Sequence, residues 1–298
     1  MQNQGKIGES QWTILKLLKW TASYFTSYRI ESPRVSAEIL LAHTLNLQRI
    51  QLYLNHDQPL IPAELDRFKA LIKRRVCGEP IAYILGRKEF WSIELEVTRD
   101  VLIPRPETER LVEAAVRHLP QSPGIGPKRV LDMGTGSGAI VLALASERPG
   151  HTYFASDRSI SALELAKRNA RRNGLDRAVH FFSGDWFLPV KRQGRPFDMI
   201  ISNPPYIPTE IIPGLQPEIC RYEPFMALDG GADGLCWIRH IVDAAQRHLN
   251  SDGLVLLEMG HDQKEEVEKI ILTCGGYKQV DFKKDYGEKY RIVQMVKK

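Results

Sequence analysis

The 298-residue sequence lacks long apolar stretches. Apolar segments such as residues 197–201 and 254–257 are much shorter than the roughly 20 residues that a helix needs to cross a bilayer. The first residues show no cationic flank followed by an apolar stretch, so we expect no signal peptide. These absences predict a cytoplasmic protein that does not contact a membrane.

Metal-ligand and disulfide patterns are also missing. The four cysteines form no Cys-x-x-Cys pair: Cys77, Cys220, Cys236 and Cys274. The eight histidines show no H-E-x-x-H spacing. The pattern is typical of reduced cytosolic thiols and predicts neither a disulfide framework nor a metal site.

The net charge of +5 lies in the N-terminal third of the chain. Residues 1–90 hold 13 Lys and Arg against 8 Asp and Glu, whereas the other 208 residues hold 28 of each sign. An ordinary solvated helical surface accounts for this excess. A docking surface for an acidic partner, or for a partner bound to nucleic acid, is the less favoured alternative.

The apolar pattern changes along the chain. In residues 10–84, apolar residues recur three and four positions apart, which predicts helices. Ser32 followed by Pro33 is typical of a capped helix start. Residues 88–103 alternate apolar and polar positions around Thr98–Asp100, which indicates a β-hairpin. We therefore predict a helical domain over 1–86, a hairpin linker over 87–104 and a larger domain over 105–298.

The larger domain alternates strands and helices. We expect seven strands, at residues 129–133, 152–156, 179–183, 197–202, 253–259, 277–282 and 291–296. We expect helices at residues 138–148, 159–173, 234–249 and 262–273. Such alternation predicts an α/β fold with a doubly wound, mostly parallel seven-stranded sheet.

A glycine-rich turn follows the first of these strands: Gly134, Thr135, Gly136, Ser137 and Gly138. Glycines let the backbone turn tightly and approach a ligand closely. The G-x-G-x-G spacing departs from the G-x-G-x-x-G dinucleotide fingerprint and disfavours NAD. A purely structural turn is the alternative interpretation.

Acidic residues end the next two strands. Asp157 is placed to accept hydrogen bonds from both ribose hydroxyls, although a role at the start of the following helix also fits. Asp185 beside Trp186 is suited to an adenine amino group and ring face. With the glycine turn, these residues resemble the class I S-adenosylmethionine-dependent methyltransferases. The resemblance implies that the turn holds the methionine half of the cofactor and Asp157 the ribose.

The fourth strand runs into Asn203, Pro204, Pro205 and Tyr206. Two prolines stiffen this corner, so the Asn203 side-chain oxygen and the Pro204 carbonyl become two fixed acceptors. They can hold both N–H bonds of a planar NH₂ group, whose delocalised lone pair makes it a poor nucleophile. We predict that Tyr206 stacks on this group and that catalysis is chiefly positioning. Because Asn203 stays neutral, the proton leaves to solvent after methyl transfer.

Further motifs narrow the substrate. They are G-E-P-I-A-Y-I-L-G at 78–86, V-L-I-P-R-P-E-T-E at 101–109, Glu223-Pro224 and A-L-D-G-G-A-D-G-L at 227–235. Together they resemble the protein-(glutamine-N5) methyltransferases of peptide chain release factors, the PrmC/HemK family. The resemblance covers most of residues 78–260, while residues 285–291 are less regular than is usual in the family.

The resemblance implies a helical domain, a hairpin linker and a class I methyltransferase domain. It implies methylation of the glutamine in the Gly-Gly-Gln motif of class I release factors, with no direct need for nucleic acid. It also implies that residues 203–206 grip this glutamine, that Trp186 borders the adenine, and that residues 105–107 lie near the active-site entrance.

Two other functions compete with this one. An adenine-specific nucleic-acid N6-methyltransferase shares the Asn-Pro-Pro-Tyr motif, but it would need a target-recognition element and a basic face around its cleft. The charge balance of residues 91–298 disfavours that function. A non-catalytic binding module would keep the fold alone, and the intact motifs disfavour it.

Overall fold

The computed structural model describes residues 12–121, 126–191 and 194–298. The chain divides into two compact units, the first ending at Leu85 and the second beginning at Gly86. The hairpin predicted as a linker therefore groups with the second unit, and the three-part division of the chain stays a prediction. Within the described residues, no helix combines the length and the apolar character that a membrane crossing requires.

The first unit is helical, as the sequence predicted. Its elements are α1 (Ile14–Ser27), α2 (Pro33–Leu45), α3 (Arg49–Leu54), α4 (Pro62–Val76) and α5 (Ile81–Leu85). Apolar side chains from all five helices fill one core that includes Phe25, Leu40, Leu52, Phe68 and Ile84. The recurrence of apolar residues at three and four positions places them on one face of each helix.

The start of α2 differs from the prediction. Pro33 occupies the first turn, but the Ser32 side chain makes no capping hydrogen bond, because Ser32 adopts a left-handed backbone with φ 47°. A capping side chain normally extends from a β-region backbone toward the next N–H groups. Instead Ser36 Oγ donates to the Glu31 carbonyl at 3.4 Å.

The hairpin turn also lies elsewhere than predicted. Strands β1 (Arg87–Phe90) and β2 (Ile93–Glu96) are joined through Trp91 and Ser92, not through Thr98–Asp100. Trp91 and Ser92 both have positive φ, at 51° and 61°. A two-residue turn of this hand matches the twist of the paired strands, and glycine or asparagine usually signals it. Trp91 and Ser92 carry no such signal.

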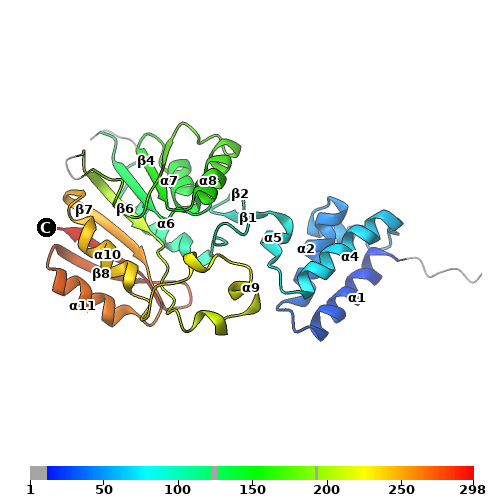
Figure 1. The fold of residues 1–298 in the computed structure, drawn as a ribbon. Helices are drawn as coiled ribbons and strands as arrows, with labels where there is room; N and C mark the ends of the chain where they lie inside the picture. The colour runs from blue at the N-terminus through cyan, green and yellow to red at the C-terminus, as the bar shows by residue number, and fades with distance from the viewer. Residues whose placement is uncertain (1–11, 122–125, 192–193) are drawn as a thin grey trace, which may run out of the picture. The chain divides into compact units, whose positions relative to one another are not determined.

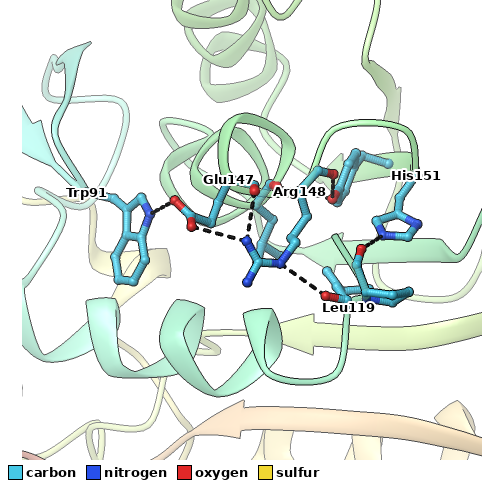
Figure 2. Close-up of polar contacts among 8 residues, drawn as sticks. Trp91, Leu119, Glu147, Arg148 and His151 are labelled. Atoms are coloured by element: carbon cyan, nitrogen blue, oxygen red, sulfur yellow. Dashed lines mark hydrogen bonds and ion pairs between the residues drawn. The ribbon is translucent and has the colours of Figure 1, made fainter. Parts of the chain in front are cut away.

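The hairpin turn is fixed to neighbouring helices of the second unit. The Trp91 backbone N–H donates to Glu109 at 3.0 Å, and its indole N–H donates to Glu147 at 3.4 Å. Figure 2 shows that Glu147 also meets Arg148, whose guanidinium donates to the Leu119 carbonyl. The end of α7 (Ala139–Glu147) thus joins the hairpin to the residues that follow α6 (Glu109–Val116).

The second unit is built on the predicted seven-stranded sheet. Its strands are β3 (Arg129–Met133), β4 (Thr152–Asp157), β5 (Val179–Ser183), β6 (Phe197–Ser202), β7 (Leu249–Glu258), β8 (Tyr277–Lys284) and β9 (Tyr290–Lys297). The strand order is β5-β4-β3-β6-β7-β9-β8. Only β9 runs antiparallel to its neighbours β7 and β8. The predicted doubly wound class is confirmed.

Helices cover both faces of this sheet (Figure 1). Helices α6, α7 and α8 (Ile160–Arg172) pack on one face, and α10 (Cys236–Ala245) and α11 (Lys264–Cys274) pack on the other. Short elements connect them: η1 (Pro106–Thr108), η2 (Ile212–Gly214), α9 (Pro217–Cys220) and η3 (Phe225–Ala227). Successive residues of a strand point to opposite faces, so Val130 and Leu131 enter different cores.

The order of the strands creates a switch point. The chain moves outward from β3 through β4 to β5 and then returns to the other side of β3 as β6. Met133 and Ser202 are register partners at the ends of β3 and β6. The next residues, Gly134 and Asn203, therefore leave the sheet side by side, where open α/β sheets bind ligands.

Burial predicts which leucines stabilise the second unit. Leu131 is fully buried in β3, so Leu131→Ala should lower the free energy of unfolding by about 2–5 kcal/mol through lost burial and a cavity. Leu272→Ala on α11 is the matched control, because Leu272 is 72% exposed, and it should change stability by less than about 0.5 kcal/mol. Urea unfolding followed by circular dichroism measures both, and equal losses would contradict this account of the core.

Candidate active site

A cavity of about 330 Å³ lies at the switch point. This volume is in the range of small-molecule sites. Its walls include nine of the residues predicted for the site: Gly134, Thr135, Gly136, Ser137, Asp157, Asp185, Trp186, Asn203 and Pro205. Gly138, Pro204 and Tyr206 are not on its walls. The structure thus brings the glycine turn, both acidic strand ends and the asparagine to one space, while their individual roles stay predictions.

The glycine turn needs its glycines for backbone reasons. Gly134 and Gly136 adopt φ values of 69° and 55°, which side chains with a Cβ rarely tolerate. The N–H groups of Gly134 and Thr135 both donate to the Ser156 carbonyl, at 2.9 and 3.0 Å. The turn is thereby held against the end of β4 and can expose backbone to the cavity.

Asp157 connects the turn to β4. Its carboxylate accepts the Gly136 N–H at 2.9 Å and the Ser159 N–H at 2.9 Å. The cap of α8 is Ser159 itself, whose hydroxyl accepts from Ala162. Burial raises the pKa of Asp157, and the backbone donors oppose that rise. A carboxylate oxygen can accept more than one hydrogen bond, so a hydroxyl-rich ligand would suit this position.

Asp185 and Trp186 form another wall. The Oδ1 atom of Asp185 is buried and has no hydrogen-bond partner within the described part of the chain. A buried acceptor of this kind is costly unless a donor reaches it. Trp186 has a left-handed backbone, φ 48°, and its ring lies 5.2 Å from that of Trp237. An adenine amino group at Asp185 and a ring face beside Trp186 would match this wall.

Asn203 lies between the cavity and a polar cluster behind it. Its Nδ2 donates to Thr108 Oγ1 at 3.2 Å. The end of β6 is itself fixed, because Ser202 Oγ donates to the Met133 carbonyl at 2.7 Å. The amide of Asn203 is therefore held close to the glycine turn, as the sequence-based mechanism requires.

Tyr206 lies apart from the main cavity. Its side chain packs on the core of α10 and α11, and it lines a neighbouring cavity of about 950 Å³. Its hydroxyl donates to Glu258 Oε1 at 3.2 Å. Burial, with the nearby charge of Glu258, raises the pKa of Tyr206. The structure therefore does not bring Tyr206 to the cavity that Asn203 and Pro205 share.

Several residues of the site were not among the predicted ones. Thr108 lines the cavity without having been predicted. Arg105, which was expected only near the entrance, also lines the cavity and forms two 2.7 Å hydrogen bonds to Glu223. Glu258 is buried behind Asn203 and meets Thr108 at 2.7 Å. Thr108 and Glu258 are 150 residues apart, so no sequence spacing connects them.

Asp132 was missed although it lies only two residues before Gly134, where the glycine turn begins. It is fully buried, accepts from Thr135 Oγ1 at 2.6 Å, and has an Oδ1 atom without a partner in the described residues. Burial raises its pKa to about 7, and the charge of Asp157 adds to this. An acidic residue near the end of an otherwise apolar strand was a visible signal, because strands seldom bury unpaired charge.

Fold and site together define a class I methyltransferase: a seven-stranded sheet with an antiparallel β9, and a glycine-turn cavity at the switch point. Solved structures show the same fold. A methyltransferase from Pyrococcus furiosus matches with TM-score 0.50 and 18% identity over 76% of this chain and 96% of that one. The catalytic domain of hMettl16 matches with TM-score 0.53 and 16% identity over 76% and 81%.

Sequence comparison is more specific. Residues 16–86 match the PrmC N-terminal domain, and residues 110–210 match the methyltransferase small domain. The release factor glutamine methyltransferase of Geobacter sulfurreducens is 45% identical over 89% of this chain and 90% of its own length. That of Escherichia coli K12 is 43% identical over 88% and 91%. The chain belongs to the release factor glutamine methyltransferase family, which confirms the resemblance seen in the sequence.

Asp132 should make stability depend on pH. Its pKa is about 7 in the folded protein and near 3.8 when unfolded, so the folded state holds more protons between these values. Stability contributed by this group therefore falls as pH rises from about 4 to about 7. Relative to the wild type, Asp132→Asn should gain about 1–4 kcal/mol of unfolding free energy across this window. Denaturant unfolding at several pH values measures the difference.

The matched control for this measurement is Asp176→Asn, since Asp176 is exposed. Its stability relative to the wild type should stay nearly constant with pH. If both variants showed the same pH dependence, the buried carboxyl of Asp132 would not be its source.

Proposed function

We propose that this protein transfers a methyl group from S-adenosylmethionine to the side-chain amide nitrogen, N5, of the glutamine in the Gly-Gly-Gln motif of class I peptide chain release factors. One observation carries the proposal. The amide of Asn203, with its nitrogen bound to Thr108, shares a cavity with the glycine turn of residues 134–137. Membership of the release factor glutamine methyltransferase family supports the substrate.

The cavity walls suit the proposed cofactor. We assign the methionine half to the glycine turn, the ribose hydroxyls to Asp157, the adenine amino group to Asp185 Oδ1 and the ring face to Trp186. The unpartnered Asp185 oxygen and the left-handed glycines support this assignment. When bound, S-adenosylmethionine supplies an electrophilic methyl group on a positively charged sulfur.

The protein would act mainly by orientation. With Nδ2 bound to Thr108, the Oδ1 atom of Asn203 remains as an acceptor for one substrate N–H. Pro204 does not line the cavity but lies between Asn203 and Pro205, which do. We assign its carbonyl as the acceptor of the second N–H, which would direct the nitrogen lone pair toward the methyl donor. A nitrogen–carbon bond forms as the sulfur–carbon bond breaks. Asn203 takes no proton, and the nitrogen loses one to solvent after transfer.

Tyr206 has a different part in this proposal from the one predicted. Its position behind the Asn-Pro-Pro corner supports anchoring of the corner through Glu258, and a stacking role would require its ring to move. The adenine-directed alternative is not favoured, because the relatives that cover most of the chain are named for release factors. A cytoplasmic location, where release factors act, and independence from nucleic acid belong to the same proposal.

Mass spectrometry tests the reaction directly. The full chain is incubated with isotopically labelled S-adenosylmethionine and a class I release factor, and the Gly-Gly-Gln peptide is then analysed. One added methyl on the glutamine side chain is expected, and a substrate with glutamine replaced by alanine should remain unlabelled. Labelling of adenine in DNA or RNA, with none on the release factor, would instead establish the alternative.

Asn203→Ala should lower kcat by about 100-fold, in the range seen when one oriented polar contact to a reacting group is removed. The dissociation constant for S-adenosylmethionine should change by less than about 3-fold, measured by calorimetry, because the other cavity walls remain. Asn250→Ala is the matched control, since Asn250 also donates a side-chain hydrogen bond, to Asp198 at 3.0 Å, but lies outside the cavity. Comparable kcat values for the two variants would refute the role of Asn203.

Asp157→Ala should mainly weaken the binding of S-adenosylmethionine, whereas Asn203→Ala should mainly lower kcat. Loss of hydrogen bonds from the ribose to a carboxylate should weaken S-adenosylmethionine binding by about 10–100-fold. Titration calorimetry measures this, with thermal unfolding to show that α8 remains folded and Asp176→Ala as a surface control. Unchanged affinity would remove Asp157 from the cofactor site.

A further inference from the structure

A buried polar chain lies behind the cavity. Asn203 Nδ2 donates to Thr108 Oγ1 at 3.2 Å, and Thr108 Oγ1 donates to Glu258 Oε2 at 2.7 Å. Tyr206 donates to the other oxygen of Glu258 at 3.2 Å. Thr108 is 4% exposed and Glu258 1% exposed. One carboxylate thus contacts the end of the Asn-Pro-Pro-Tyr corner directly and its beginning through one hydroxyl.

We propose, on the basis of the function proposed above, that Thr108 and Glu258 are positioning residues that fix which end of the Asn203 amide faces the substrate. The amide has an oxygen that accepts and a nitrogen that donates, and the two ends have the same shape. Only the oxygen end can accept an N–H from a substrate amide. Methyl transfer therefore requires the contacts of Asn203 to distinguish the oxygen end of its amide from the nitrogen end.

The hydrogen bonds make that distinction. A threonine hydroxyl has one proton, and Glu258 in its ionised form can only accept it. Thr108 can then only accept from its other neighbour, so the nitrogen end of Asn203 must face Thr108. With the amide reversed, Oδ1 would face the hydroxyl lone pairs, and two acceptors would be buried against each other without a proton between them. The carboxylate thereby sets the amide through the hydroxyl.

The contacts also explain why a carboxylate is buried here. Desolvation makes a buried carboxylate unfavourable, and Glu258 has hydrogen bonds from Thr108 and Tyr206 to offset this. The two donors come from segments far apart in sequence, η1 and the loop after β6, while Glu258 ends β7. A side chain that served only to fill space could be apolar. The two carboxylate oxygens of Glu258 are the acceptors that connect these two segments.

Thr108→Val tests the hydroxyl at nearly constant shape. It should lower kcat for glutamine methylation by about 10–100-fold, since reactions that depend on orientation lose about this much from a small misplacement. Affinity for S-adenosylmethionine should change by less than about 3-fold. Thr108→Ser, which keeps the hydroxyl, should restore kcat to within about 3-fold of the wild type. The matched control is Tyr277→Phe, which removes a buried hydroxyl that donates to the Val242 carbonyl at 2.8 Å, remote from the cavity, and should leave kcat unchanged.

Glu258→Leu tests the same series of hydrogen bonds by removing the carboxylate that accepts from Thr108. Without the carboxylate, the Thr108 proton is free to turn toward Asn203 and favours the reversed amide. We expect a loss of kcat similar to that of Thr108→Val, again with cofactor affinity retained. Should the valine variant fail to fold, this variant carries the test. Wild-type kcat in either folded variant would overturn the inference.

A double-mutant cycle shows whether Thr108 acts through Asn203. Thr108→Val should lower kcat by about 10–100-fold in the wild type but by less than about 3-fold in the Asn203→Ala background, where no amide remains to orient. Equal effects in both backgrounds would overturn the inference while leaving the proposed function intact. If the wild-type protein itself does not methylate the Gly-Gly-Gln glutamine, the proposed function fails first, and this inference falls with it.

Discussion

The parallel pairing of β3 with β6 is the constraint on which the site depends. Met133 and Ser202 are partners in this pairing, and the Ser202 hydroxyl binds the Met133 carbonyl at 2.7 Å. The glycine turn and the Asn-Pro-Pro-Tyr corner are the next residues of these two strands. A methyl donor seated over the turn and a nitrogen gripped by Asn203 are therefore brought together by the ladder hydrogen bonds of the sheet. Covering helices on both faces bury the ladder and make it rigid.

Around this pairing, three fully or partly buried carboxyl groups have separate tasks. Asp132 supports the glycine turn through Thr135, Asp157 holds the turn to β4 and faces the cavity, and Glu258 stands behind the corner. Burial raises the pKa of all three, to about 7 for Asp132 and Glu258. Carboxylates that orient hydrogen bonds in a dry environment lower stability at neutral pH. Such a cost is expected where a site needs fixed polar groups.

The sequence was sufficient for much of the fold. The strand at 197–202 and the helix at 160–172 have apolar residues at the spacing typical of each element. Tertiary packing did not override these local patterns. The hairpin turn was misplaced because Trp91 and Ser92 adopt left-handed backbones without a glycine or asparagine to signal them. The cap of α2 was misjudged for a related reason, since Ser32 has a favourable residue type but an unfavourable backbone angle.

By itself, the sequence determined the class of chemistry, because the glycine turn, the acidic strand ends and Asn203 to Tyr206 are each contiguous motifs. It also determined the family, which the matching relatives confirm. Only the tertiary structure decided that Tyr206 turns away from the cavity and that Thr108 and Glu258 meet behind Asn203. These contacts join residues up to 150 positions apart. A local pattern encodes the direction of a strand and the residues at its end, whereas hydrogen bonds between distant segments exist only after the sheet has placed those segments side by side.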